Sequence, residues 1–192
     1  ATYGSLVRAH ETLNATKLHS VESKNIFDFG QNFAGVIKIK IKKAKAGQKL
    51  VIRHAEILKP NGDLNTDFLR TAKATITYIC SEGDQEYSPK FTYMGFRYIS
   101  IEGMDPTNYE VEGIVLYSDI KQIGHFETSN PLLNQLQSNI VWSSKSNFMD
   151  IPTDCPQRDE RMGWTGDIAL FAPTANFNFN LTRFIDKWLV DV

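Results

Sequence analysis

One stretch in the first quarter of the chain alternates strictly between apolar and basic residues, and it reads Val36-Ile37-Lys38-Ile39-Lys40-Ile41-Lys42. Because successive side chains of a β-strand point to opposite faces, this order places Ile37, Ile39 and Ile41 on one face and the lysines on the other. A strand with one apolar and one charged face is typical of a sheet that covers a core on one side. The stretch therefore predicts a half-exposed strand with its isoleucines buried.

Segments with the same β-branched and aromatic character surround this strand up to about residue 120. They cover residues 50–53, 74–80, 96–101 and 111–116. Turn residues such as glycine, proline, asparagine and aspartate separate them, at residues 46–47, 60–63, 82–84 and 105–108. Many short strands at near-regular spacing predict an antiparallel β-sandwich of jelly-roll type, which we assign to residues 1–122.

After residue 125 the spacing of apolar residues changes to that of α-helices. Asn130 followed by Pro131 predicts a helix start, with an apolar stripe along it and an end near Ser146. The stripe consists of Leu132, Leu133, Leu136 and Ile140. A short helix is expected over 169–175, interrupted at Pro173, and another from Thr182 onward.

So few amphipathic helices cannot bury their apolar stripes against each other. We therefore expect residues 123–192 to be the N-terminal, incomplete portion of a larger helical domain, and the chain to be a fragment. The alternative is a complete β-sandwich with a helical tail packed across it. Trp142 and Trp188 lie on the helical stripes and are predicted to pack in the core.

The charge balance limits the class of partner. Lys+Arg 21 against Asp+Glu 22 gives a formal net charge of -1, so no global field attracts nucleic acid or an anionic membrane surface. No apolar run approaches the roughly 20 residues that a membrane helix needs. We therefore expect a neutral ligand, no nucleic acid and no membrane, whereas compartment and oligomeric state are left open.

Cysteines and histidines do not form a metal-binding pattern. Cys80 and Cys155 are the two cysteines, and we predict free thiols, with Cys155 a small buried residue. The four histidines are scattered along the sequence, which gives no zinc-type spacing. His54 and His125 are expected to have structural roles.

The most polar segment of the helical part runs from Asp154 to Asp167 and reads Asp-Cys-Pro-Gln-Arg-Asp-Glu-Arg-Met-Gly-Trp-Thr-Gly-Asp. Pro156 near one end, and Gly163 and Gly166 near the other, predict a loop. Tryptophan beside carboxylates suits a sugar, because the ring stacks on a pyranose while the carboxylates accept hydrogen bonds from its hydroxyls. Two alternatives remain: a surface salt-bridge network, or a calcium or magnesium site that two arginines disfavour.

Together with Ile151-Pro152-Thr153 before it, this segment resembles the signature of the bacterial inverting α-L-rhamnosidases, glycoside hydrolase family 78. Their signature typically reads D-C-P-Q-R-D-E-R-L-G-W-T-G-D, so this chain differs at Met162. Ile168-Ala169 also departs from the usual alanine-glutamine. The layout is similar as well, because the family has a β-sandwich before an (α/α)6 barrel. The resemblance implies that the helices here begin such a barrel.

The resemblance also implies a function for individual residues. Glu160 corresponds to the general acid, and the rhamnose subsite corresponds to Asp154, Arg158, Trp164 and Asp167. The general base is a second glutamate, which we expect beyond residue 192. The implied reaction is hydrolysis of terminal α-L-rhamnosyl residues with inversion, on a rhamnose-containing glycoside, with no metal and no cofactor.

Physical reasoning about the segment agrees with these roles. A general acid must be protonated near neutral pH, and neighbouring acids together with burial raise the pKa of a carboxyl. Asp159 lies next to Glu160, and a folded loop can bring Asp154 or Asp167 close to it. We expect Gly163 and Gly166 to let the chain turn sharply around Trp164.

Two other functions remain as alternatives. The β-sandwich itself could be a carbohydrate-binding or scaffolding module, with a platform of aromatic residues. Candidates for this platform are Tyr87, Phe91, Tyr93, Phe96 and Tyr98. The helical part could also belong to a related helical-barrel hydrolase that acts on another deoxy or uronic sugar.

Overall fold

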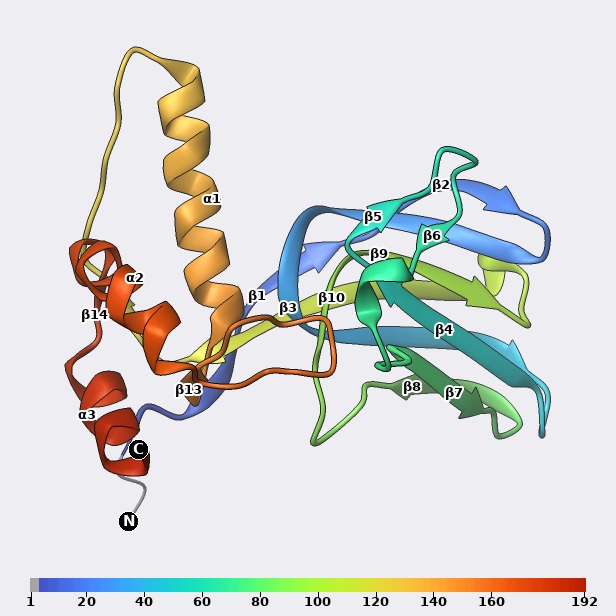
Figure 1. Cartoon of the computed structure of the whole chain (residues 1–192). Coiled ribbons are helices and arrows are strands. Elements are labelled where there is room, and N and C mark those ends of the chain that lie inside the picture. The colour runs from blue at the N-terminus through green and yellow to red at the C-terminus, as the bar shows by residue number, and fades with distance from the viewer. Residues whose placement is uncertain (1–3) are drawn as a thin grey trace. The chain divides into compact units, whose positions relative to one another are not determined.

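The computed structural model describes residues 4–192, and its first part is an antiparallel β-sandwich (Figure 1). The strands follow the order β1-β10-β3-β9-β4-β7, and β2 and β8 also pair with β3. The main strands are β1 (Val7–Asn14), β2 (Thr16–Val21), β3 (Lys24–Ala44), β4 (Lys49–Ala55), β7 (Thr75–Ile79), β8 (Gly83–Tyr87), β9 (Met94–Glu102) and β10 (Tyr109–Ser118). Between them lie β5 (Ile57–Leu58), β6 (Leu64–Asn65) and the 3₁₀ turns η1 (Asp67–Leu69) and η2 (Pro106–Asn108). The predicted sandwich is confirmed.

The long strand β3 changes its neighbours along its length. Its first half pairs with β2 and β9, and its second half pairs with β10 and β8. Ile37, Ile39 and Ile41 have exposed fractions of 0%, 0% and 1%, so the alternation does predict the buried face. The lysines of the opposite face are half-buried or exposed, and Lys42 pairs with Glu110 of β10 at 2.8 Å.

Aromatic rings fill the core of the sandwich. Phe33 of β3 and Phe96 of β9 are fully buried, and their ring centroids lie 4.5 Å apart. His54 of β4 is also fully buried, with its ring edge against Phe96 at 4.8 Å. The burial of Phe96 excludes it from the aromatic platform considered above, and His54 has the structural role that was expected.

The second part contains three helices. They are α1 (Pro131–Asn147), α2 (Thr165–Asn178) and α3 (Thr182–Asp191), with the short strands β11 (Lys121–Gln122), β12 (Phe148–Met149), β13 (Ile151–Pro152) and β14 (Phe179–Asn180) around them. The start of α1 is confirmed, because the Asn130 side chain accepts a hydrogen bond of 2.9 Å from the Leu132 N–H. Phe184 and Trp188 bury one face of α3, as predicted.

The prediction for α2 was wrong in extent. The helix begins at Thr165, inside the segment predicted as a loop, and it continues through Pro173 to Asn178. An internal proline costs about 3 kcal/mol because it removes one N–H donor and crowds the preceding turn. Burial of Ile168 and Ala175, on either side of Pro173, keeps the two halves in one helix.

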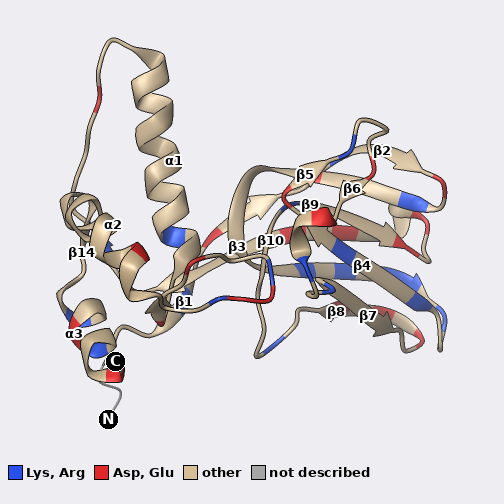
Figure 2. Cartoon of the chain, in the orientation of Figure 1, with Lys and Arg blue, Asp and Glu red and all other residues tan. Residues whose placement is uncertain are grey.

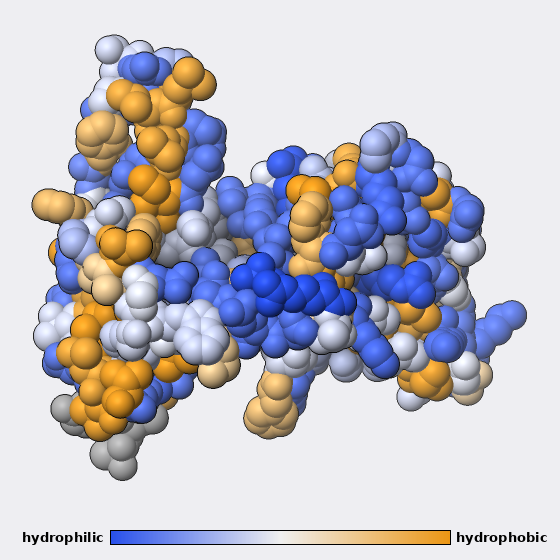
Figure 3. All heavy atoms as spheres, viewed as in Figure 1, coloured by the Kyte–Doolittle hydropathy of each residue, from blue (hydrophilic) through white to orange (hydrophobic). Residues whose placement is uncertain are grey.

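The apolar stripe of α1 remains exposed. The exposed fractions of Leu132, Leu133 and Leu136 are 77%, 44% and 54%, and Figure 3 shows apolar side chains gathered along this helix. Within residues 4–192, no helix is both long and apolar enough to cross a membrane.

The chain divides into two compact units by its internal contacts. One unit contains residues 11–115 together with 157–159, and the other contains residues 4–10, 116–156 and 160–192. Residues 157–159 of the acidic segment therefore belong to the unit that contains the sandwich, and the rest of the segment belongs to the other unit. The predicted domain boundary after residue 122 stays a prediction.

Candidate active site

Residues 154–162 of the acidic segment form a loop that is closed by two hydrogen bonds between Asp154 and Met162. The N–H of Asp154 donates to the carbonyl of Met162 at 3.0 Å, and the N–H of Met162 donates to Asp154 Oδ1 at 2.7 Å. These two bonds fix the spacing between residues 154 and 162. Glu160 therefore lies in a closed loop of the chain. Figure 2 shows acidic and basic residues together along this loop.

Glu160 is half-buried and contacts Trp164. The indole Nε1–H of Trp164 donates to Glu160 Oε1 at 2.9 Å. Trp164 precedes the first residue of α2, and 48% of its surface is exposed. The ring therefore orients the carboxyl group through its N–H and still presents surface to a ligand. Sequence reasoning assigned only the ring face to Trp164 and missed the role of its N–H.

Asp154 lies close to Glu160. Side-chain atoms of Asp154, Cys155 and Glu160 lie within 4.8 Å of one another. Cys155 and Cys80 are both buried and neither forms a disulfide, so the prediction for both cysteines is confirmed. A thiol is a poor ligand for calcium or magnesium, which prefer oxygen. The expectation that no metal takes part stays a prediction.

Asp154 and Asp167 line one hollow of the helical unit. Its volume is about 300 Å³, and its wall also contains Asn147, Thr153 and the aromatic ring of Phe171. Asp167 lies in the first turn of α2, where the positive end of the helix dipole favours a negative charge. The lining of the hollow thus includes two carboxylates, one amide and an aromatic ring.

Asn147 and Thr153 were not predicted as site residues. The Thr153 hydroxyl and backbone N–H both donate to the carbonyl of Asn147, at 2.9 and 2.8 Å. This contact joins the end of α1 to the residue before Asp154. Thr153 could have been noted because it directly precedes the acidic segment, whereas no signal distinguished Asn147 from other helical residues.

Arg158 and Asp159 belong to the sandwich unit. Arg158 is half-buried. Its predicted contact with the sugar stays a prediction. Asp159 Oδ2 accepts hydrogen bonds from the hydroxyl and the N–H of Thr71, the latter at 3.3 Å. The Thr71 hydroxyl, through its hydrogen bond, holds the pKa of the Asp159 carboxyl below its usual value. Within the helical unit, Glu160 thus contacts Trp164 and lies near Asp154. Asp167 shares a hollow with Asp154 that neither Glu160 nor Trp164 lines, and Arg158 belongs to the other unit.

The two glycines do not have the turn role that was expected. Gly163 and Gly166 are absent from the glycines with positive φ, so neither uses left-handed backbone. Gly163 is required for close packing, because a Cβ there would lie 2.8 Å from Trp188 Nε1 and 3.3 Å from Ile151 Cδ1. Nothing lies within 4 Å of a Cβ at Gly166, which is already inside α2.

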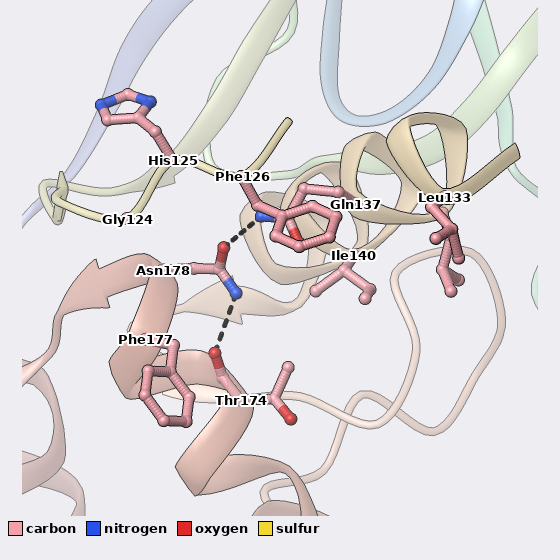
Figure 4. Close-up of a pocket in the computed structure, with 10 residues that line it drawn as sticks. Gly124, His125, Phe126, Leu133, Gln137, Ile140, Thr174, Phe177 and Asn178 are labelled. Atoms are coloured by element: carbon pink, nitrogen blue, oxygen red, sulfur yellow. Dashed lines mark hydrogen bonds between the residues drawn. The ribbon is translucent and has the colours of Figure 1, made fainter. Parts of the chain in front are cut away.

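A larger hollow of about 440 Å³ lies elsewhere in the helical unit (Figure 4). It is lined by residues of α1 and α2, including Leu133, Ile140 and Phe177. Asn178 Oδ1 accepts a hydrogen bond from Gln137 Nε2 at 2.6 Å, and its Nδ2 donates to the carbonyl of Thr174 at 2.8 Å. Its lining contains no carboxylate. Glycoside cleavage requires carboxyl groups, so the acidic loop is the better candidate for the active site.

Comparison with known proteins identifies the family of the chain. Residues 18–117 match the model of the bacterial alpha-L-rhamnosidase concanavalin-like domain, and residues 121–192 match that of the bacterial alpha-L-rhamnosidase 6 hairpin glycosidase domain. An alpha-L-rhamnosidase of Formosa agariphila is 49% identical over 172 residues, which cover 87% of this chain and 18% of that protein.

Solved structures give the same result. The alpha-L-rhamnosidase of Streptomyces avermitilis, complexed with L-rhamnose, has a TM-score of 0.95 and 41% identity, and the match covers 100% of this chain and 19% of that one. The enzyme from Dictyoglumus thermophilum has a TM-score of 0.93 and 43% identity, over 98% of this chain and 22% of that one. The chain spans between 16% and 22% of the length of the curated relatives it matches. The model of one bacterial alpha-L-rhamnosidase domain matches residues 18–117, and the model of a second such domain matches residues 121–192. The chain therefore belongs to the bacterial α-L-rhamnosidase family.

Proposed function

We propose that this chain supplies the general acid and part of the sugar subsite of an inverting α-L-rhamnosidase. The observation that supports this most directly is the hydrogen bond from the Trp164 indole to Glu160 Oε1, with Asp154 beside the same carboxyl. A protonated carboxyl can accept this bond at its carbonyl oxygen. The proton on Oε2 is then available to a leaving group.

In the proposed reaction, Glu160 gives its proton to the glycosidic oxygen as the bond from that oxygen to the anomeric carbon breaks. A second, ionised carboxylate removes a proton from water, which attacks the anomeric carbon from the opposite face. The two carboxyl groups of such a pair lie about 6.5–9.5 Å apart to leave room for the water. We propose that the second carboxylate lies in a part of the polypeptide outside residues 1–192.

The residues around Glu160 have binding roles in this proposal. Asp154, Arg158 and Asp167 bind hydroxyls of the rhamnosyl ring, and the exposed surface of Trp164 packs against the ring. Rhamnose carries an apolar C6 methyl, and burying one methyl gains about 0.8 kcal/mol. The identity of the sugar is supported by the relatives named above, one of which is complexed with L-rhamnose.

Replacing Glu160 with glutamine in the full gene product tests the role of the acid. General acid catalysis contributes about 10²–10⁴-fold, so kcat on a rhamnosyl disaccharide should fall within this range while rhamnose binding persists. The loss should be smaller on 2,4-dinitrophenyl rhamnoside, whose leaving group needs no proton. Glu127→Gln is the matched control, because Glu127 is an exposed acid of the helical unit outside the loop.

Two further measurements accompany this experiment. NMR of the first product formed should give the β-anomer if the enzyme inverts configuration, and EDTA should leave the rate unchanged. Equal losses for Glu160→Gln on both substrates, or no loss at all, would contradict the acid assignment. Activity on another deoxy or uronic sugar, with none on rhamnosides, would favour the alternative substrate class.

A further inference from the structure

The residue directly before Glu160 is held by a threonine that is distant in sequence. Thr71 and Asp159 are 88 positions apart, yet both the hydroxyl and the backbone N–H of Thr71 donate to Asp159 Oδ2. Both residues belong to the sandwich unit, although Glu160 follows Asp159 by one peptide bond. A hydrogen bond to an ionised acceptor is stronger than one between neutral groups, so the pair favours one conformation of the loop.

The segment that carries Thr71 is itself fixed at both ends. On one side Leu69 is buried, and its N–H donates to the carbonyl of Thr66 at 3.1 Å. On the other side the carbonyl of Ala74 accepts two hydrogen bonds from His54, one from its backbone N–H at 3.0 Å and one from its Nδ1 at 2.9 Å. Because His54 is fully buried, the position of Ala74 is tied to the core of the sandwich.

The backbone of this segment is also strained on both sides of Thr71. Arg70 has a φ of 53° and Ala74 a φ of 42°, which is left-handed backbone that residues with a Cβ rarely adopt. Such a conformation is unfavourable for residues with a Cβ and persists only when surrounding contacts determine it. The segment is therefore held in one shape that presents Thr71 to Asp159.

The other side of Glu160 is fixed by the pair of bonds between Asp154 and Met162. Glu160 thus lies between a hydrogen-bonded Asp159 and a hydrogen-bonded Met162, and its side chain is bonded to Trp164. These contacts help to determine where its carboxyl group lies, and the contact at Asp159 comes from the sandwich unit.

We propose that Thr71 is a positioning residue for the general acid and acts through Asp159, so that the β-sandwich takes part in catalysis by holding the loop that carries Glu160. This inference rests on the proposed function. Thr71 touches no reacting atom. Loss of its hydroxyl removes one of the two hydrogen bonds that Thr71 donates to Asp159 and leaves the longer one from the backbone, so a smaller fraction of molecules has Glu160 in the productive place. A displacement of about 1 Å can cost on the order of 100-fold in rate.

The test compares three variants of the full gene product. Thr71→Val removes the hydroxyl, Thr71→Ser keeps it, and Thr107→Val is the matched control. Thr107 makes the same pair of bonds, because its N–H and hydroxyl both donate to Asp105 Oδ1, at 2.9 and 2.6 Å. We expect Thr71→Val to lower kcat about tenfold or more with KM within about twofold, while Thr71→Ser and Thr107→Val stay near the wild type.

A double-mutant cycle distinguishes loss of the Thr71–Asp159 contact from a general loss of stability. Asp159→Asn should lower kcat in the same direction, and the double variant Thr71→Val/Asp159→Asn should lose little beyond the worse single variant. Unfolding in urea checks that all variants fold. Wild-type kcat in Thr71→Val, equal impairment in Thr71→Ser, or fully additive losses would overturn the inference.

A spectroscopic measurement on the present chain distinguishes failure of this inference from failure of the proposed function. The pKa of Asp159, followed by carboxyl ¹³C NMR, should rise toward its ordinary value in Thr71→Val, and the amide signals of residues 158–162 should broaden or shift. If the full gene product does not cleave rhamnosides, the proposed function fails. If instead the titration and these signals match the wild type, the positioning inference fails.

Discussion

Replacing His54 with asparagine should make the sandwich less sensitive to acid. Burial lowers the pKa of His54 to about 4, against an ordinary value of 6.5, and the ring donates through Nδ1 to the carbonyl of Ala74. When pH falls below 6.5, the unfolded chain takes up a proton at this site and the folded chain does not. The stability present above pH 6.5 is therefore lost progressively until pH reaches about 4.

The magnitude follows from the two pKa values. With 1.36 kcal/mol for each pKa unit, His54 lowers the free energy of unfolding by about 2 kcal/mol between pH 7.5 and pH 5, and by about 3 kcal/mol below pH 4. The carboxylates with lowered pKa, such as Asp28 and Asp63, have ordinary pKa values of 3.8, so they act mainly below this window. Measurements between pH 7.5 and pH 5 therefore isolate the histidine.

The assay is urea unfolding of the wild type and His54→Asn at several pH values, followed by circular dichroism of the sheet. Asparagine can still donate to Ala74, so the variant keeps that bond but loses ring volume and the titration. We expect the variant to be less stable at pH 7.5, with a smaller further loss down to pH 5. Equal losses in both proteins, or an NMR titration of the His54 ring centred near 6.5, would refute the reasoning.

Two further changes test the packing and charge contacts. Gly163→Ala should lower the free energy of unfolding of the helical unit by about 1–3 kcal/mol, because the added Cβ would meet the buried Trp188 ring. Gly166 has open space around it, so Gly166→Ala should change this free energy by less than about 1 kcal/mol. Thermal unfolding by circular dichroism compares the two, and equal effects would contradict the packing argument. Asp28→Asn should lower the free energy of unfolding in urea by about 1–3 kcal/mol, because Arg97 donates to both Asp28 oxygens at 2.8 and 2.9 Å. Asp119 forms a largely exposed pair with Arg8 at 3.3 Å, so Asp119→Asn should lower it by less than about 1 kcal/mol. Similar losses in these two variants would mean that the bidentate geometry adds nothing.

The sequence by itself predicted the features that depend on local chemistry. The alternation at residues 36–42 predicted a strand and its buried face, because side chains of a strand alternate wherever the strand lies. Asn130 and Pro131 predicted the start of α1, because capping involves residues only two positions apart. The acidic segment also stood out locally, since its residue types alone indicate a sugar site.

Other features depended on contacts between distant parts of the chain. The extent of α2 through Pro173 could not be predicted, because burial of Ile168 and Ala175 outweighs the local preference against proline. The role of Gly163 required the position of Trp188, which lies on another helix. The indole bond to Glu160 required the angle at which the chain enters α2.

The bond from Thr71 to Asp159 is the clearest case of this kind. Nothing near Thr71 in the sequence marks it as a partner of the acidic loop. Threonine suits a turn because of its own local hydrogen bonds, whether or not a distant segment contacts it. The residue types of the acidic loop are thus a local feature and were readable from the sequence. The placement of Glu160 was decided only by the tertiary structure, because it depends on hydrogen bonds that form once distant segments have packed together.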